Sequence, residues 1–444
     1  MRRRYLSLIT LLLPALTIAQ EPIALSLEDA MNFAVKNNLT AKNARLDILL
    51  QEAKNAEITG IALPQVKGQG QFTDYLNPMK SFIPGDFVGA PGTFIPVQFT
   101  PKYNVTANGQ ASQILFDGSV FVALQARKTI ISLFEQNAKL TEEDIRYEVQ
   151  KAYYSFVIAQ RQYDILKAAL KNSREILADI VAMRNAGFVE KIDVDRTTLQ
   201  VNNLATDSIR IGGMINTSEQ LLKYRLGMPM DRAIVLTDTV VENTVNSARE
   251  ILAQEANYIN RTEFGLLQTQ LKLNQYDLKR HRLSGLPSLA AFANAGYNFA
   301  TNDFDQVTQF RKYYQFSSFW GLNLNVPIFD GMQRRNRVKQ AKIAVEKTQN
   351  DIENLKLGID FQSEQSRTTL KNSLLALESQ KKNMELGNTV LDLAQRKYKE
   401  GVGSNMEVTQ AQSELLQAQS NYFQALLDVV NSQSDLQRAL GDFK

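Results

Sequence analysis

The sequence predicts a mainly α-helical protein made of two similar halves, in which long coiled-coil helices alternate with a few amphipathic β-strands. Three observations predict this class: a duplication, stretches in which apolar and polar residues alternate, and long proline-free stretches with heptad spacing. The duplication is the most informative. Phe116-Asp117-Gly118 returns 213 positions later as Phe329-Asp330-Gly331, and Leu226-Gly227 returns 214 positions later as Leu440-Gly441. A period this long indicates a duplicated half-molecule rather than an array of short repeats.

Residues 1–19 are expected to be a secretory signal peptide that is removed after export. Arg2, Arg3 and Arg4 form its basic start, an apolar run follows, and small residues precede Gln20. The apolar run is too short for a membrane helix, which needs about 20 residues. Without the three arginines the chain has 47 basic and 46 acidic residues, so its charge gives no reason to expect nucleic acid as a partner.

The residues that most enzymes use for catalysis are scarce in this chain. There is no cysteine, which excludes disulfides and thiolate metal sites, and the single histidine, His281, lies in a basic run and is expected to be solvated. No phosphate-binding glycine loop or hydrolase motif is present. The sequence therefore predicts no enzyme, no metal site and no cofactor.

The first half begins with a helix that is expected to run from Ser26 to about Ile61. Ser26 is a good helix cap, Glu28 and Asp29 follow it, and Pro64 ends the helix. A β-hairpin is then predicted over 65–116. Apolar and polar residues alternate at its second strand, which gives the strand one apolar and one polar face: Tyr103, Val105 and Ala107 against Asn104, Thr106 and Asn108. The proline- and glycine-rich segment 76–100 is expected to be a long loop.

The second half repeats this order, with a helix ending at Pro287 and a hairpin predicted over 288–328. Its second strand alternates Leu322, Leu324 and Val326 with asparagines, and the segment 300–312 is expected to be a loop. Four strands per chain are too few to close a sheet on themselves. If the sheet crosses a membrane, its open edges must be closed by further copies of the chain.

Each hairpin is followed by long helices, expected over 118–226 and 331–440. The last of them has apolar residues at alternating spacings of three and four, which predicts left-handed coiled-coil packing. A seam of small residues recurs every seventh position, at Ala411, Ala418, Ala425, Ser432 and Ala439. The opposite face is polar but uncharged: Gln410, Gln412, Ser413, Gln417, Gln419, Ser420, Asn421 and Gln424. Such a face suits the lining of an aqueous conduit, and it is also compatible with an ordinary exposed helix surface low in charge.

The signal peptide, the duplication, the two strands per half and the glycine-centred helix turns together resemble the TolC family of outer-membrane efflux and secretion channels, from about Leu25 to Gly441. The resemblance implies a homotrimer in which three chains pool their strands into one outer-membrane β-barrel and their helices into a periplasmic α-barrel. It divides the chain into a signal peptide (1–19), a first repeat (20–227), an equatorial linker (228–247), a second repeat (248–441) and a short tail (442–444).

The resemblance also implies where a periplasmic gate and an adaptor-docking surface lie, at the two helix-turn-helix tips. The tips centre on Gly187, Gly401 and Gly403, and the gate candidates are Asp193, Glu407 and Tyr398. Gly403 stands where the family pattern has an arginine, and Gln410 stands where it has a second acidic residue, so the arginine link is missing and the acidic ring is thinner. Asp193 and Glu407 have an alternative role, the stabilisation of a helix N-terminus by negative charge.

The function that the resemblance implies is a passive exit duct in the outer membrane of a Gram-negative bacterium. Its implied partners are outer-membrane lipid, a periplasmic adaptor protein and an inner-membrane pump of the RND or ABC type. The alternative is a secreted coiled-coil structural or adhesive protein, whose helices should carry charged flanking positions and no regular hairpins. The exported substrate is not encoded in any motif of the sequence.

Overall fold

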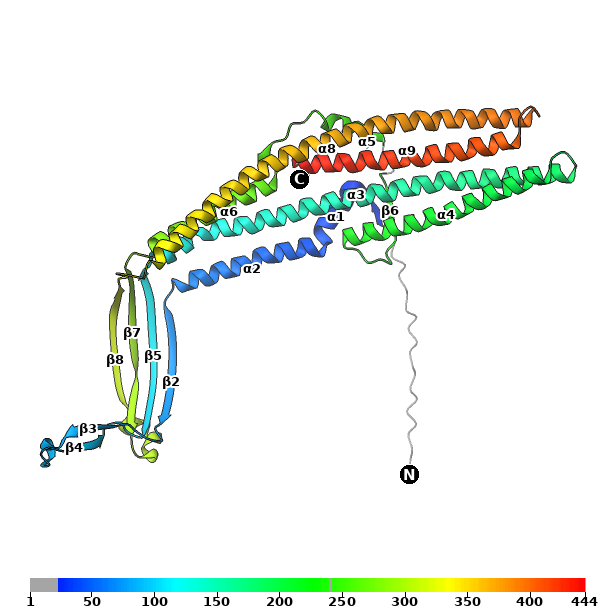
Figure 1. Ribbon diagram of the computed structural model, residues 1–444. Coiled ribbons are helices and arrows are strands. Elements are labelled where there is room, and N and C mark those ends of the chain that lie inside the picture. The colour runs from blue at the N-terminus through cyan, green and yellow to red at the C-terminus, as the bar shows by residue number, and fades with distance from the viewer. Residues whose placement is uncertain (1–22, 239–241, 444) are drawn as a thin grey trace, which may run out of the picture. The chain divides into compact units, whose positions relative to one another are not determined.

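The computed structural model describes residues 23–238 and 242–443, so the predicted signal peptide and residues 239–241 of the predicted linker lie outside the described part (Figure 1). The chain forms two compact units, each assembled from stretches of both halves. The helical unit comprises the chain up to Ala44, Ala138–Thr262 and the chain from Lys356; the sheet unit comprises Arg45–Asn137 and Glu263–Leu355. Most of the elements by length are helices, which confirms the predicted mainly α class.

The two halves carry the same pair of long helices. In the first half, α3 (Gly118–Asn185) has 68 residues and α4 (Lys191–Leu226) has 36. In the second half, α8 (Gln333–Lys399) has 67 residues and α9 (Asn405–Leu440) has 36. No proline interrupts any of the four. Within 23–238 and 242–443, none of the helices combines the length and the apolar character needed to cross a bilayer.

Helices α4 and α9 end in the same way, at glycines 214 positions apart. Gly227 and Gly441 are left-handed, with φ of 68° and 75°. In the first cap, the N–H of Gly227 donates to the carbonyl of Tyr224 (3.1 Å) and the N–H of Met228 to that of Lys223 (2.9 Å). Gly441 and the residue after it make the equivalent bonds at 3.1 and 2.9 Å. These paired bonds are the Schellman cap, which glycine accommodates without steric cost.

The predicted single helix from Ser26 to Ile61 is wrong in one respect, because the helix breaks at Asn38. Helix α1 spans Leu27–Asn37 and α2 spans Leu39–Ile61. Asn38 has an extended ψ of 134°. Its side-chain oxygen accepts from the N–H of Thr40 (2.8 Å), and its side-chain amide donates to the carbonyl of Arg225 (2.9 Å). Asn38 therefore caps a new helix and ties the break to the end of α4.

The core of the helical unit gathers around Tyr153 of α3, which has no exposed surface. Its hydroxyl donates to the carbonyl of Leu25 and accepts from the N–H of Asp238, each at 3.1 Å. These two residues belong to or follow a small parallel sheet of β1 (Ile23–Leu25) and β6 (Ile234–Leu236). Helix α5 (Glu242–Ile251) packs against α9 beside it. One tyrosine thus joins the start of the described chain to the segment between the halves.

The sheet unit contains a four-stranded antiparallel sheet in the order β2-β5-β7-β8 (Figure 1). Its strands are β2 (Gln65–Asp74), β5 (Tyr103–Phe116), β7 (Ser288–Thr301) and β8 (Gln315–Asn325). The central pair joins the two halves of the chain, because β5 comes from the first and β7 from the second. β2 and β8 are the edges, and neither has a second strand partner among the described residues.

The register of the sheet gives it one apolar and one polar face, since directly paired residues point to the same side. On one face, Val105 pairs with Phe72 and with Phe299. One position along, Thr106 pairs with Gln71 and Asn298 on the other face. The apolar face continues across β7 and β8 through Tyr297–Phe316, Ala293–Trp320 and Ala291–Leu322. The opposite face is formed mainly by Gln, Asn, Thr and Ser.

The predicted loop 76–100 is not free of regular structure. It contains a second antiparallel hairpin of β3 (Lys80–Pro84) and β4 (Phe94–Gln98), in which Phe82 pairs with Pro96 and Ile83 with Ile95. The hairpin lies at the end of the sheet away from α2 and α6 (Thr262–Leu283) (Figure 1). Each of its strands has only five residues and contains a proline, so the sequence pattern did not predict this hairpin. The loop 300–312 likewise contains two short helices, η3 (Phe304–Thr308) and α7 (Phe310–Tyr313).

Candidate functional site

The tips of the two helix pairs, α3–α4 and α8–α9, are built by the same turn. Gly187 and Gly401 are left-handed, with φ of 84° and 76°. At the first tip, the N–H of Gly187 donates to Arg184 (2.9 Å) and that of Phe188 to Met183 (2.9 Å). At the second, Gly401 and the residue after it make the equivalent bonds at 3.1 and 3.0 Å. The duplicated glycines are therefore conformational necessities of each tip.

Asp193 and Glu407 occupy the same position, the third residue of the helix that leaves each tip. Ser404 caps α9, and its hydroxyl accepts from the N–H of Glu407 (3.2 Å). Together, Ser404 and Glu407 have the spacing of a capping box, a signal that is present in the sequence. Glu190 at the equivalent place in α4 makes no such side-chain bond. Both acidic residues lie where negative charge stabilises a helix.

The structure brings Asp193 close to Tyr398. Burial raises the pKa of Tyr398, and the nearby charges of Asp193 and Asp179 raise it further. The Tyr398 hydroxyl contacts the sulfur of Met183 at 3.9 Å, which links the end of α8 to the end of α3. A tyrosine proton held in this way can donate a hydrogen bond but is hard to remove.

Asn405 joins the two tips and was not identified from the sequence. It is 4% exposed at the first position of α9, and its side-chain amide donates to Thr197 Oγ1 (3.1 Å) and to the carbonyl of Asp193 (3.3 Å) on α4. An asparagine beside a turn is commonplace, and its partner lies 208 residues away. No pattern in one sequence identifies such a pair.

Glu407 is exposed and borders a groove of about 490 Å³ between α8 and α9. Leu393 and Met406 give the groove apolar walls, while Lys397 and Glu414 give it charge. Gln410 also lies here and donates to Glu414 (2.7 Å). Gln410 is thus paired with an acidic residue one turn further along the helix.

Gly403 has a local steric reason to be glycine. A Cβ placed on it would lie 2.9 Å from the Cβ of Lys397 and 3.1 Å from the N of Tyr398. The N–H of Gly403 also donates to the carbonyl of Lys397 (3.0 Å). The chain is therefore packed too tightly at this point for the arginine that the family pattern carries, unless the turn changes.

Two faces were predicted for α9, a seam of small residues and an uncharged polar face, and the structure differs from the second at one residue. Ala411, Ala425 and Ala439 are at most 7% exposed and Ala418 is half-buried, so the seam lies largely inside the packing of a single chain. Most of the polar face is exposed or half-buried, but Gln412 is an exception. It is 6% exposed and donates to Ser173 Oγ of α3 at 2.6 Å, so it belongs to the interior of the chain.

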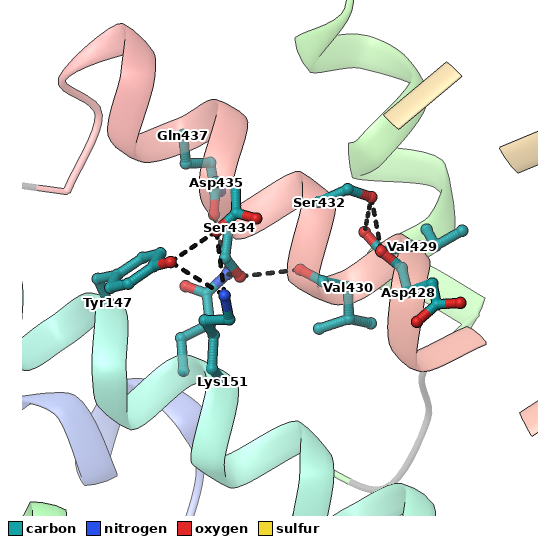
Figure 2. A network of polar contacts seen from close by, with 10 residues as sticks. Tyr147, Lys151, Asp428, Val429, Val430, Ser432, Ser434, Asp435 and Gln437 are labelled. Atoms are coloured by element: carbon teal, nitrogen blue, oxygen red, sulfur yellow. Dashed lines mark hydrogen bonds and ion pairs between the residues drawn. The ribbon is translucent and has the colours of Figure 1, made fainter. Parts of the chain in front are cut away.

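A second polar cluster, absent from the sequence-based predictions, joins α3 to the end of α9 (Figure 2). Tyr147 donates to Asp435 at 2.6 Å, and Lys151 donates to both of them at 2.9 and 3.1 Å. Burial raises the pKa of Tyr147, and its bond to Asp435 adds to this. Arg438 pairs with Asp144 at 2.6 Å nearby. The cluster fixes the rotation of α9 against α3.

The described residues contain no group of three or more His, Cys, Asp or Glu that could hold a metal ion. His281 lies 3.4 Å from Asp277 on the same helix.

Comparisons with known proteins find similarity to outer membrane proteins of efflux and secretion systems. The family model described as outer membrane efflux protein matches residues 259–442. The outer membrane protein TolC of Vibrio cholerae is 22% identical over 78% of this chain and 81% of its own length. The alkaline protease secretion protein AprF of Pseudomonas aeruginosa is 18% identical over 72% of this chain and 66% of its own. The solved structure of the outer membrane protein VceC from Vibrio cholerae has a TM-score of 0.69 at 13% identity, over 94% of this chain and 96% of that one.

Proposed function

The chain belongs to the TolC family of outer-membrane channels, and from this premise we propose that three copies form one passive exit duct of an efflux or type I secretion system. The duct crosses the outer membrane and extends into the periplasm, where it docks to an adaptor protein and an inner-membrane pump of the RND or ABC type. The driving force comes from that pump, so this chain needs no catalytic site.

The observation that carries the proposal is the amphipathic sheet with two free edges. Its strands have 10 to 14 residues, and a tilted strand needs about 9–11 to cross a bilayer. One face is apolar and the other polar, as expected for a wall between lipid and a water-filled pore. Free strand edges cannot remain unpaired in lipid. With four antiparallel strands per chain, β2 and β8 run in opposite directions, so rotated copies pair β8 to β2 and close a barrel.

The helical unit supports association of the copies because it exposes large apolar residues at coiled-coil spacing. On α4, Ile192 and Leu199 are seven residues apart, and on α8 so are Leu386 and Leu393. Each is 48–63% exposed in the single chain. A helix with a second apolar stripe requires a second partner, and the neighbouring copies around a common axis supply one. The secreted adhesive protein considered as an alternative has no use for the sheet, and no structural feature favours it.

We assign the gate to the tips, with Asp193 and Glu407 forming a negative ring at a narrowed pore mouth and Tyr398 holding neighbouring coils together. Three copies bring six carboxylates to one opening, where low-dielectric walls strengthen their field. The same tips offer the adaptor a docking surface around Gly187, Gly401 and Gly403. Phe188 and Val402, which follow the turn glycines, are 81% and 78% exposed there.

Single-channel recording in planar bilayers tests the duct and its gate together. The purified protein should give discrete conductance steps with cation selectivity, and Asp193→Ala with Glu407→Ala should reduce both that selectivity and block by divalent cations. The matched control is Asp47→Ala with Glu52→Ala, which removes two exposed carboxylates from α2. Tyr398→Phe should raise the resting conductance. If the purified protein gives no conductance, the duct is contradicted. If the tip variant keeps the selectivity of the parent, the acidic ring is contradicted and the duct is not.

A further inference from the structure

Eight exposed lysines and arginines gather where the sheet meets two helices, and we call them the basic collar. They are Lys279, Arg280 and Arg282 at the end of α6, and Arg334, Arg335, Arg337, Lys339 and Lys342 at the start of α8. Only two acidic residues, Asp277 and Asp330, lie in the same two stretches (277–283 and 330–342). All of these residues belong to the sheet unit.

Much of the positive charge of the collar is not neutralised by the chain itself. Arg280 pairs with Asp277 at 2.7 Å, and Lys342 lies 4.0 Å from Glu346. In contrast, no carboxylate in the described part of the chain lies within ion-pair distance of four members of the collar: Arg282, Arg334, Arg335 and Lys339. These four cations are available to an external anion.

The arginines of α8 oppose the electrostatics of their own helix. Arg334 and Arg335 are the second and third residues of α8, where the helix dipole favours negative charge, and the first turn contains no acidic residue. The equivalent third positions of α4 and α9 carry Asp193 and Glu407. Asp330 Oδ2 already caps this helix start by accepting from the N–H of Arg334 at 2.7 Å. Helix stability therefore does not explain the arginines.

The duplication supplies an internal comparison. At an offset of 213, the positions of Arg334, Arg335, Arg337 and Lys339 correspond to Phe121, Val122, Leu124 and Ala126 of α3. Val122 is 2% exposed and Ala126 is 8% exposed, whereas Phe121 is 45% exposed, so the first half buries one side of this helix start. The strand-to-helix turn is shared by both halves, and it forms without basic residues in the first. The collar is thus a specific property of the second half.

The collar follows directly on an apolar surface. Leu324, Ile328 and Phe329, at and beyond the end of β8, are 63–94% exposed, and the arginines begin five residues after Phe329. Gly285, in the turn after α6, lies directly against Arg334 of α8. A Cβ on this glycine would lie 1.4 Å from Nη1 of Arg334. Arg334 therefore lies over the turn between α6 and β7. Apolar side chains followed by arginine and lysine are the pattern of a bilayer's hydrocarbon edge and its phosphate layer.

We infer that the basic collar binds the phosphate groups of anionic glycerophospholipids in the membrane leaflet on the helix side of the sheet. Arginine pairs with phosphate in a bidentate manner, and several cations near an anionic surface act together. This leaflet is assigned because the collar lies at the end of the sheet opposite the β3–β4 hairpin (Figure 1). The inference rests on the proposed function, since it requires the sheet to span the membrane.

Lipid retention by the purified full-length channel tests the inference. The protein in detergent is mixed with dioleoylphosphatidylglycerol or, separately, dioleoylphosphatidylcholine, and bound lipids are counted by native mass spectrometry. The parent should retain phosphatidylglycerol about tenfold better or more, since each cation near an anionic surface contributes on this scale. Arg334→Gln, Arg335→Gln and Lys339→Gln together should abolish that preference. The control is Lys371→Gln, Lys381→Gln and Lys399→Gln, three exposed lysines further along α8, which should retain it.

Two further arms separate the possible outcomes. A variant with Arg334→Lys and Arg335→Lys keeps the charge and should keep most of the preference, so a loss caused only by misfolding is recognised. Inorganic phosphate should protect the protein against heat no better than sodium chloride of equal ionic strength. Equal retention of both lipids by the parent, an unchanged preference in the triple glutamine variant, or protection by inorganic phosphate overturns the lipid site. A conducting trimer without lipid preference leaves the proposed function intact, whereas loss of conductance in the parent contradicts that function.

Discussion

Tyr153 is a buried side chain in the core of the helical unit, and its hydroxyl adds a link between Leu25 of β1 and Asp238 after β6 to the pairing of the two strands. Burial is the main cause that raises its pKa, to about 12. At the residue scale, Asp193, Glu407 and Tyr398 are candidates because the resemblance to the TolC family places a gate beside the turn glycines. The sequence did not indicate Tyr153, whose partners Leu25 and Asp238 lie 128 and 85 residues away. Helix caps can be predicted because their residues are close together in the sequence. Hydrogen-bond partners that tertiary packing brings together cannot be predicted in this way.

The raised pKa of Tyr153 predicts a loss of stability at high pH. In the unfolded chain this tyrosine ionises near pH 10, and in the folded chain near 12, so the folded state holds the proton in between. Its contribution is complete below pH 10 and is lost as the pH rises through about 12, by about 2–3 kcal/mol at most. Denaturant unfolding measured from pH 9 to 12 should show this decline.

The control for that measurement is Tyr153→Phe. At neutral pH this variant should be less stable by about 1–3 kcal/mol, because the carbonyl of Leu25 and the N–H of Asp238 lose their partner. Its stability should then depend less on pH between 10 and 12 than that of the parent. Tyr224→Phe, at a side chain that is 64% exposed, should follow the parent curve. Parallel curves for the parent and Tyr153→Phe contradict the assignment.

At the scale of elements, periodicity in the sequence predicted the long helices and the four strands of the sheet because each has a uniform pattern over many residues. The elements it did not predict are short or irregular. The break at Asn38 depends on a bond to Arg225, and β3 and β4 are five-residue strands with a proline in each. The pairing of β5 with β7 also lay beyond the sequence, because alternation gives a strand its faces and not its neighbours.

The two faces of β5 predict opposite responses to a charge in the middle of the strand. Ala111 pairs with Val66 and Ala293 on the apolar face, and the adjacent Gln110 pairs with Lys67 and Asn294 on the polar face. Ala111→Arg should destabilise the membrane-inserted protein by about 2–4 kcal/mol near the bilayer centre. Gln110→Arg is the control and should assemble normally. Heat-modifiable migration of the outer-membrane fraction on gels reports assembly, and equal tolerance of both arginines contradicts the orientation of the sheet.

At the scale of the whole molecule, the sequence showed a duplication but not how its halves combine. Both compact units contain segments of both halves, so neither half is a structural domain by itself. Closing the sheet edges requires further copies of the chain, but with four strands from each copy it allows any barrel whose strand number is a multiple of four. The family resemblance supplies the number three.

Cross-linking of the sheet edges tests that number, and the absence of cysteine makes it simple. Gln69 on β2 and Ser317 on β8 lie in one row of the register, through Asn108 and Gly296. A chain with Gln69→Cys and Ser317→Cys, treated in membranes with a short bismaleimide, should give bands of one, two and three chains and none larger. Each single cysteine variant should stay monomeric. A ladder that ends at two chains or continues past three excludes the trimer.

The β5–β7 pair also sets the order of events during biogenesis. A chain exported from its N-terminus delivers β5 about 170 residues before β7 begins. Throughout that interval the apolar residues of β2 and β5 have no completed sheet to join, and one edge of β5 is open to any other strand. Long-range pairing of this kind forms slowly. We therefore expect the four-stranded sheet to form only after the second half of the chain has emerged.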